Sequence, residues 1–291
     1  MALTHDYYPY HIPIMDWRKW QSILSLVGYV FLGFFSLWGL RKKNVFAYAI
    51  LFYLLTLFIT SNIPFSIGTF MNERFVFVSS LGFTMMIAFF TTNWLNKKRI
   101  SSFFSYGIIS IFLLFFGAKT LLRVPVWQDE LHLNKAAIKI SKNSARSNAF
   151  YGVALFKKHQ KMTEGPEKDA VFQQFSYHIE RALEIYPKYG SALMMYGGVL
   201  AERYKYDDNL PKLLDGFYEI LKIRPHDAYI EKYLNYLNKR NVSQTDLINF
   251  YYKIGNYLKN NNLKGYAKKF YNMGLKIAPD NQQLQIQLNN L

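Results

Sequence analysis

An adjacent acid and base, Glu73 and Arg74, stand at the beginning of a long apolar stretch of the chain. A guanidinium group presents a planar fork of N–H donors, which can bind two oxygens of a phosphate at once. The neighbouring carboxylate could hold that fork in position. The alternative is a structural ion pair that caps the start of the apolar stretch. The pair is therefore a candidate contact for a phosphate group, with the structural ion pair as the alternative interpretation.

A second candidate is Asp6, which lies between His5 and Tyr7 near the start of the chain. A carboxylate whose pKa is tuned towards neutrality can accept the proton of a hydroxyl group, as a general base does. A single carboxylate in a loop can equally serve to order that loop. Asp6 is thus a candidate base, and the sequence identifies no other catalytic group.

The pattern of ligating residues does not indicate metal or cofactor chemistry. The chain contains no cysteine, so thiolate sites and disulfides are excluded. The six histidines show no ligand spacing on one helical face: His5, His11, His132, His159, His178 and His226. We expect no metal site, and no cofactor motif is identifiable.

Four apolar stretches have the length needed to cross a bilayer, about 20 residues at a rise of about 1.5 Å each. They cover residues 21–40, 45–63, 75–93 and 102–122. We therefore expect a membrane domain over residues 21–123 that is a bundle of about four transmembrane helices. Residues 1–20 are polar and aromatic, and their tryptophans are typical of a loop at the headgroup level outside the cytoplasm.

The charges in short loops predict the orientation of these helices. Basic clusters at Arg41–Lys43 and Lys97–Arg99 follow the first and third stretches, so both fall on one side of the bilayer. Basic loops face the cytoplasm, which would place everything after residue 123 outside it. Richness in Tyr, Phe, Asn, Lys and Ile is typical of an AT-rich bacterial genome. We expect an integral protein of a bacterial inner membrane with its C-terminal domain extracytoplasmic.

Residues 124–291 show apolar residues at helical spacing, interrupted by Pro, Gly and Asn clusters. Near the end of the chain, Gly255, Gly274 and Pro279 follow one another at the separations of the tetratricopeptide consensus. Small residues let two antiparallel helices approach closely, and the proline ends the second helix. The sequence therefore predicts a helical repeat in this region.

Two earlier units carry the same residue types with longer turns. The positions that mark the repeats are Gly152, Ala182, Pro187, Gly197, Pro225, Gly255, Gly274 and Pro279. Residues 227–239 are expected to form a degenerate unit, and residues 281–291 a capping helix. The expected fold is all-α, with a tetratricopeptide-type α-solenoid of about three repeats after the membrane helices. Such arrays bind peptides or subunits in a groove, and a structural spacer is the alternative.

The formal net charge of the chain is +16. A basic surface can bind nucleic acid, anionic lipid or acidic glycans. The positive residues are, however, scattered over several predicted helices without a nucleic-acid motif, which favours an ordinary solvated surface. We expect no nucleic-acid partner.

The segment from Thr60 to Gly82 carries a spaced pattern of Ser-Asn, Pro, Gly, Glu-Arg, Ser and Gly, in TSNIPFSIGTFMNERFVFVSSLG. This pattern resembles that of protein O-mannosyltransferases that combine transmembrane helices with tetratricopeptide repeats, and of their bacterial relatives. The resemblance extends upstream to residues 6–13 and downstream to Trp127 and residues 144–146. Nearly the whole chain is covered.

The resemblance implies the C-terminal part of a membrane glycosyltransferase that moves a sugar, mannose in this family, from a polyprenyl-phosphate carrier to a protein Ser or Thr outside the cytoplasm. The expected partners are the lipid bilayer, the polyprenyl-phosphate sugar donor and an acceptor protein held by the repeats. The family's presumed catalytic acid belongs to an N-terminal membrane half with no counterpart here, so the resemblance leaves open whether this chain is itself an enzyme. The alternative is a non-catalytic, membrane-anchored scaffold whose repeats gather envelope proteins.

Overall fold

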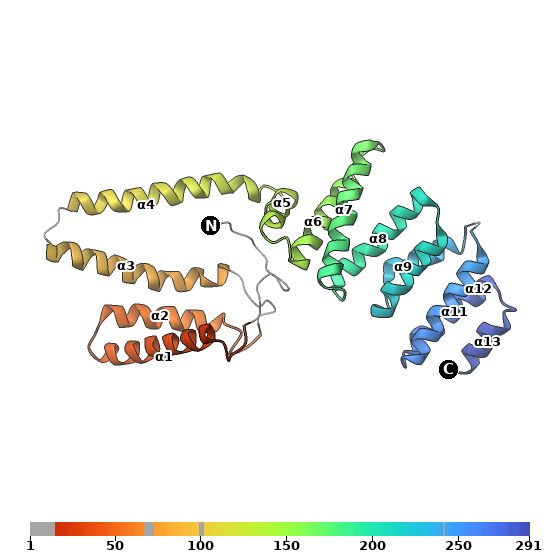
Figure 1. Ribbon diagram of the computed structural model, residues 1–291, viewed down its shortest axis with the longest axis horizontal. Coiled ribbons are helices and arrows are strands. Elements are labelled where there is room, and N and C mark those ends of the chain that lie inside the picture. The colour runs from red at the N-terminus through yellow and green to blue at the C-terminus, as the bar shows by residue number, and fades with distance from the viewer. Residues whose placement is uncertain (1–14, 67–72, 99–101, 241) are drawn as a thin grey trace. The chain divides into compact units, whose positions relative to one another are not determined.

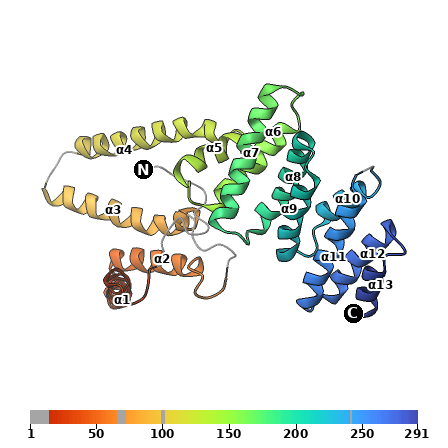
Figure 2. The same ribbon diagram turned by 45° about the vertical axis from the view of Figure 1, so that its right-hand side comes forward.

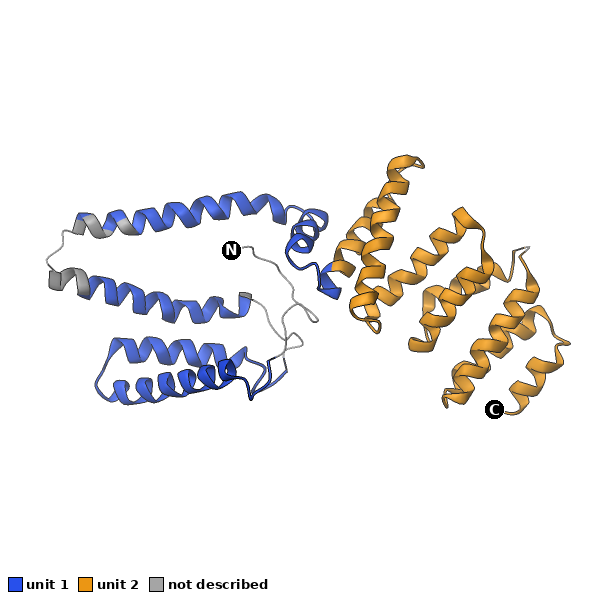
Figure 3. Cartoon of the chain, in the orientation of Figure 1, with its two compact units in different colours: residues 1–147 blue, residues 148–291 orange. Residues whose placement is uncertain are grey.

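The computed structural model describes residues 15–66, 73–98, 102–240 and 242–291 (Figure 1). These residues form helices and connecting turns and contain no β-strand, which confirms the expected all-α class. The chain divides into two compact units, residues 1–147 and 148–291 (Figure 3). The expected boundary after residue 123 separates membrane from aqueous parts and stays a prediction.

The first unit contains four long helices, followed by shorter elements. Its elements are α1 (Trp20–Arg41), α2 (Val45–Ile59), η1 (Glu73–Phe75), α3 (Val76–Lys98), α4 (Ser102–Arg123), η2 (Val124–Trp127) and α5 (Glu130–Ile140). Within the described residues, three helical segments are long and apolar enough to cross a bilayer: Trp20–Arg41, Val76–Asn93 and Ile109–Trp127. The fourth apolar helix, α2, has 15 residues. These helices make the chain an integral membrane protein.

Helix α2 packs between α1 and α3 through its small residues. Ala47 and Ala49 are fully buried, and a Cβ added at Gly39 of α1 would lie 2.6 Å from the Ala47 Cβ. The hydroxyls of Thr56 in α2 and Ser79 in α3 form a hydrogen bond of 3.0 Å. Because lipid tails are as apolar as leucine, membrane helices associate through such close backbone approach and hydroxyl contacts.

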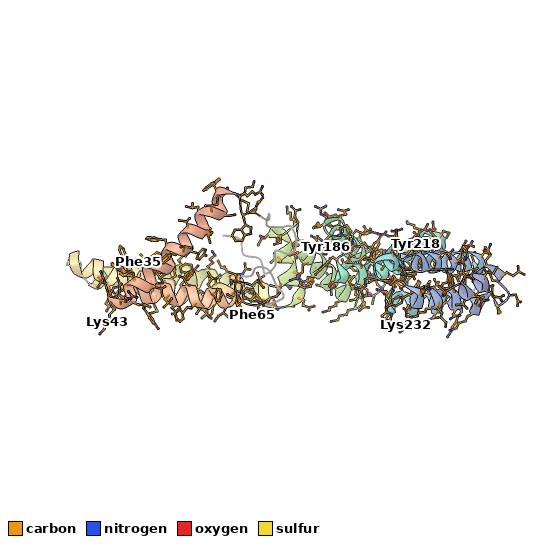
Figure 4. All side chains as sticks on the ribbon, turned by 90° about the horizontal axis from the view of Figure 1, so that it is seen from below. Phe35, Lys43, Phe65, Tyr186, Tyr218 and Lys232 are labelled. Carbon is orange, nitrogen blue, oxygen red and sulfur yellow. The ribbon has the colours of Figure 1, made fainter. Side chains whose placement is uncertain are left out.

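Helix α2 runs antiparallel to both α1 and α3 (Figure 1). The turn Arg41–Lys43 and the end of α3 at Lys98 therefore lie at one end of this group, and η1 lies at the other. Figure 4 shows Lys43 and Phe65 at these opposite ends. At the basic end, the Lys42 ammonium nitrogen stands 3.8 Å from the centroid of the Trp38 ring. A cation over an indole is suited to the headgroup region.

The second unit is a stack of antiparallel helices, which Figure 2 shows side by side. Its elements are α6 (Ala145–His159, which begins just before the unit boundary), α7 (Pro166–Ile185), α8 (Gly190–Asp207), α9 (Leu210–Ile223), α10 (Ala228–Leu237), α11 (Gln244–Asn260), α12 (Lys264–Ile277) and α13 (Gln282–Asn289). The packing is compatible with a tetratricopeptide-type array. The short α10 occupies the expected degenerate unit, and α13 occupies the expected capping helix.

Polar side chains define where several of these helices begin. Asn209, Asp227, Ser243 and Asn281 each accept a hydrogen bond from a backbone N–H in the first turn of α9, α10, α11 and α13. Each cap satisfies a donor that has no partner inside the helix, which contributes about 1 kcal/mol. Large side chains such as Phe217 and Tyr251 are fully buried between the helices.

Candidate functional sites

The beginning of the Thr60–Gly82 segment ends helix α2. The Ser61 hydroxyl donates to the Phe58 carbonyl at 2.6 Å, and the Ile63 N–H donates to the Ser61 Oγ at 3.3 Å. Asn62 adopts a left-handed backbone conformation with φ of 61°. Asparagine tolerates this conformation better than most residues. The Ser-Asn part of the pattern is therefore explained by the end of the helix.

The last residues of the segment hold α3 against α2. Ser79 is fully buried and bonds to Thr56. A Cβ added at Gly82 would lie 2.5 Å from the Ala49 carbonyl oxygen and 3.1 Å from the Tyr53 backbone nitrogen. Since backbone cannot move aside cheaply, glycine is required here for helix packing. The Ser and Gly of the pattern are structural.

Arg74 is the described cation of the pattern. It lies in η1 directly before α3, its side chain is exposed, and its guanidinium carbon stands 5.5 Å from the centroid of the Phe75 ring. The unpaired N–H groups at the start of a helix add partial positive charge, which favours an anion nearby. An exposed guanidinium at this end of the helices can contact a lipid phosphate.

The other candidates near the membrane lie wholly or partly outside the described residues. This applies to Asp6, and to the side chain of Glu73, whose backbone forms the first residue of η1. The Glu73–Arg74 pair and the general-base role of Asp6 stay predictions. In the sequence, Glu73 is the only carboxylate between Asp16 and Asp129.

The glycines and the alanine that mark the repeats are packing positions. A Cβ at Gly152 would lie 2.6 Å from the Ile179 Cδ1, and one at Gly274 would lie 2.6 Å from the Leu284 Cδ1. At Gly255 it would overlap the ring of Tyr271. The remaining two, Ala182 and Gly197, are also buried, the latter beside Tyr229 and Ile230.

The three prolines stand at equivalent places in the second unit. Pro187, Pro225 and Pro279 each come two residues after the last residue of α7, α9 and α12. The residue between helix and proline has nearly the same conformation each time, with φ/ψ of −140°/91°, −129°/78° and −130°/83°. Proline disfavours the helical conformation of the residue before it, so the helix must stop there. The three helices thus end by one local mechanism.

A groove between α8 and α10 on the second unit has a volume of about 930 Å³. We call it the tyrosine groove. It is lined by Tyr204, Lys205, Asp208, Tyr229, Lys232, Tyr233, Tyr236, Leu237, Arg240 and Val242.

Three tyrosines of α10 form a row along this groove. The ring centroids of Tyr229 and Tyr233 are 6.1 Å apart, and those of Tyr233 and Tyr236 are 5.6 Å apart. Burial raises the pKa of Tyr233 to about 12, so its hydroxyl stays protonated at neutral pH. The guanidinium carbon of Arg240 lies 4.7 Å from the centroid of the Tyr236 ring. The row combines aromatic surface with hydroxyl groups and a cation.

Sequence reasoning anticipated that the repeats bind a partner in a groove but did not locate that groove. The signal was present, because residues 229, 233 and 236 have the i, i+4, i+7 spacing of one helical face. The contributions of Lys232 and Arg240 were missed.

In the part of the chain that the structure describes, no group of three or more acidic or histidine side chains could hold a metal ion.

Comparison with known proteins finds no family model that matches the chain. The chain is 25% identical over 207 residues to the human protein O-mannosyl-transferase TMTC1, and 26% identical over 132 residues to mouse TMTC3, which carries the same description. These matches cover 68% and 43% of this chain, but only 22% and 14% of the relatives. The chain thus spans about a fifth or less of their length. Over these parts it is similar to protein O-mannosyl-transferases.

Proposed function

We propose that the chain is the membrane and repeat portion of a glycosyltransferase that moves a sugar from a polyprenyl-phosphate carrier to Ser or Thr hydroxyls of a protein. The observation that carries this proposal is the similarity to TMTC1 over 207 residues. The Thr60–Gly82 pattern supports it further. By analogy with the names of these relatives, the proposed sugar is mannose. The proposed role of the repeats, of tetratricopeptide type, is to recruit the acceptor.

The transfer breaks the bond between the sugar C1 and a phosphate oxygen and forms a bond between C1 and the acceptor oxygen. The acceptor hydroxyl gives its proton to a base, and the polyprenyl phosphate leaves as an anion. Arg74 would stabilise the negative charge that develops on that phosphate. Its location at the end of the helices opposite Arg41–Lys43 supports a site on the extracytoplasmic face of a bacterial inner membrane.

The base is the part of this chemistry that the described residues do not supply. Glu73 is the only carboxylate between Asp16 and Asp129, and a base must stand within hydrogen-bond reach of the acceptor hydroxyl. This observation favours a second function, a non-catalytic membrane-anchored scaffold whose repeats gather envelope proteins. The two proposals differ in whether sugar is transferred.

The test is an assay of mannosyl transfer from a synthetic polyprenyl-phosphate donor to Ser/Thr peptides. The chain is purified in detergent, alone and in a form extended by the sequence encoded upstream. We expect transfer by the extended form and little by the chain alone. Absence of transfer by both forms would favour the scaffold.

Arg74 provides a separate test, because Arg74→Lys keeps the charge but loses the planar fork. We expect this variant of the extended form to bind the carrier phosphate about tenfold more weakly. Unchanged affinity for the lipid phosphate would remove Arg74 from the site.

A further inference from the structure

We propose that the tyrosine groove binds an acidic segment of a polypeptide. The inference rests on the proposed function only in that such a segment would belong to the acceptor protein. It specifies both where on the second unit the acceptor docks and which chemistry the groove selects.

The charges around the groove leave two cations without a carboxylate partner. The Lys205 ammonium is 2.6 Å from the Glu202 carboxylate, and Asp208 bonds to the Tyr204 hydroxyl. Glu231, on the same helix as the tyrosine row, is 2.5 Å from the Lys269 ammonium.

Lys232 and Arg240 remain. Among the described residues neither side chain forms an ion pair, and the Arg240 guanidinium stands over the ring of Tyr236 and near Tyr204. Both are exposed. Asp208 keeps one negative charge in the groove lining, so Lys232 and Arg240 together leave the groove with a net positive charge, which is complementary to carboxylates.

The aromatic row suits an extended chain of amino acids. Tyr229 and Tyr236 are each 44% exposed, while Tyr233 packs between them, 5.8 Å from the ring of buried Phe217. Tyrosine rings that are already held in place offer contact area at little cost in conformational entropy. Their hydroxyls can also bond to peptide groups. About 930 Å³ is at the upper end of the range for binding pockets and accommodates several residues.

The opposite side of the same unit provides an internal comparison, and Figure 4 labels Lys232 and Tyr218 on the two sides. There, Lys222 and Lys253 also stand over tyrosine, with ammonium nitrogens 5.4 and 4.4 Å from the centroid of the Tyr218 ring. Both are neutralised, because Lys222 pairs with Glu219 at 2.9 Å and Lys253 with Asp215 at 3.1 Å.

Lysine beside tyrosine therefore occurs on both sides, but the uncompensated charge belongs to the groove. A neutral glycan could stack on the tyrosines and would leave Lys232 and Arg240 without a partner. The charge balance thus favours an acidic polypeptide over a neutral sugar.

The experiment measures binding of fluorescent Ser/Thr-containing peptides to the full chain in detergent by anisotropy. One peptide carries four Glu residues, and its matched control carries Gln at the same positions. We expect the Glu peptide to bind at least about tenfold more tightly at low salt, with the difference shrinking as salt is added. The double variant Lys232→Gln/Arg240→Gln should lose this preference.

The matched control is Lys222→Gln/Lys253→Gln on the Tyr218 side, which should keep the preference for the Glu peptide. A second groove variant, Tyr236→Ala, should weaken both peptides because it removes shared aromatic contact. All variants change exposed or partly exposed side chains, and far-UV circular dichroism verifies that the helices are intact.

Two results would overturn the inference: equal binding of the Glu and Gln peptides, or an unchanged preference in the groove double variant. Competition by a neutral mannose oligosaccharide together with equal peptide binding would assign the groove to glycans instead. The assay needs no sugar transfer. Selective binding of the Glu peptide together with no sugar transfer by the upstream-extended form would refute the proposed function and leave the groove assignment standing.

Discussion

The two units of the chain bring helices together in opposite ways. In the membrane unit the large side chains point outwards: Phe34 is 71% exposed and Phe77 is 79% exposed. The close backbone approaches of α2 to its neighbours occur at glycine and alanine, and a serine and a threonine bond between α2 and α3, while Phe46 of α2 also contacts Phe89 of α3. In the repeat unit the large side chains lie inside, and Phe175 and Phe217 are at most 1% exposed. The solvent decides the difference, because water drives phenylalanine inwards and lipid does not.

The comparison predicts the largest effect for Phe217→Ala in the repeat unit. Removing this fully buried ring should lower the free energy of unfolding by about 3–5 kcal/mol, because transfer energy is lost and a cavity remains. The matched change Phe77→Ala in α3 should cost less than about 1 kcal/mol in detergent, where the ring already faces apolar solvent. Denaturant unfolding followed by circular dichroism measures both. Equal losses of unfolding free energy at the two positions would contradict the difference described between the two units.

A second effect is expected where a small residue holds membrane helices together. Gly82→Leu should destabilise the α2–α3 pair by about 1–3 kcal/mol, since its Cβ meets the Ala49 carbonyl. Gly33→Leu in α1 is the control, because a Cβ there has nothing within 4 Å. Thermal melting in detergent compares them, and a lower melting temperature for the Gly33 variant than for the Gly82 variant would contradict the packing described.

Acid should weaken the repeat unit through His178. Burial lowers the pKa of this imidazole to about 4, whereas the unfolded chain binds the proton near pH 6.5. The stabilisation is therefore complete above about pH 6.5 and is lost as the pH falls towards 4. Because the ring is partly exposed, we expect a loss of about 1–2 kcal/mol.

His178→Phe should flatten this part of the pH profile, since phenylalanine does not titrate and can keep the ring contacts with Tyr151 and Tyr177. Denaturant unfolding at pH 4, 5, 6 and 7 measures the profile. An unchanged slope in the His178 variant would exclude this histidine as the source.

The smallest effect is expected for the interhelical hydroxyl pair. A double-mutant cycle of Thr56→Val and Ser79→Ala should give a coupling of about 0.6 kcal/mol, the typical value for such bonds between membrane helices. Melting in detergent can resolve this coupling when all four proteins are compared. A coupling near zero would leave close backbone approach as the main source of the α2–α3 contact.

The sequence predicted the extent of two apolar helices closely because their signals are local. The apolar stretches 21–40 and 102–122 fall within one residue of α1 and α4. The stretch 45–63 contains a shorter helix, because Ser61 and Asn62 end α2 near Ile59. The repeat prolines were recognised because each acts on the residue directly before it.

The candidate sites were harder to predict because they depend on contacts between helices. Ser79 and Gly82 belong to a family-like pattern, and only the packing of α3 on α2 reveals that they hold helices together. The tyrosine groove depends on how α8 and α10 face each other, and on which charges find partners across the unit. A charge count cannot distinguish Lys232 from Lys253, although one remains without a carboxylate and the other pairs with Asp215.

The most direct test of the proposed glycosyltransferase is the transfer of labelled mannose from a synthetic polyprenyl phosphate to a Ser/Thr peptide by the upstream-extended form. We predict transfer that falls at least about tenfold in Arg74→Lys. The absence of transfer by the extended form, with its helices intact and its lipid donor present, would contradict the assignment to this class of enzyme.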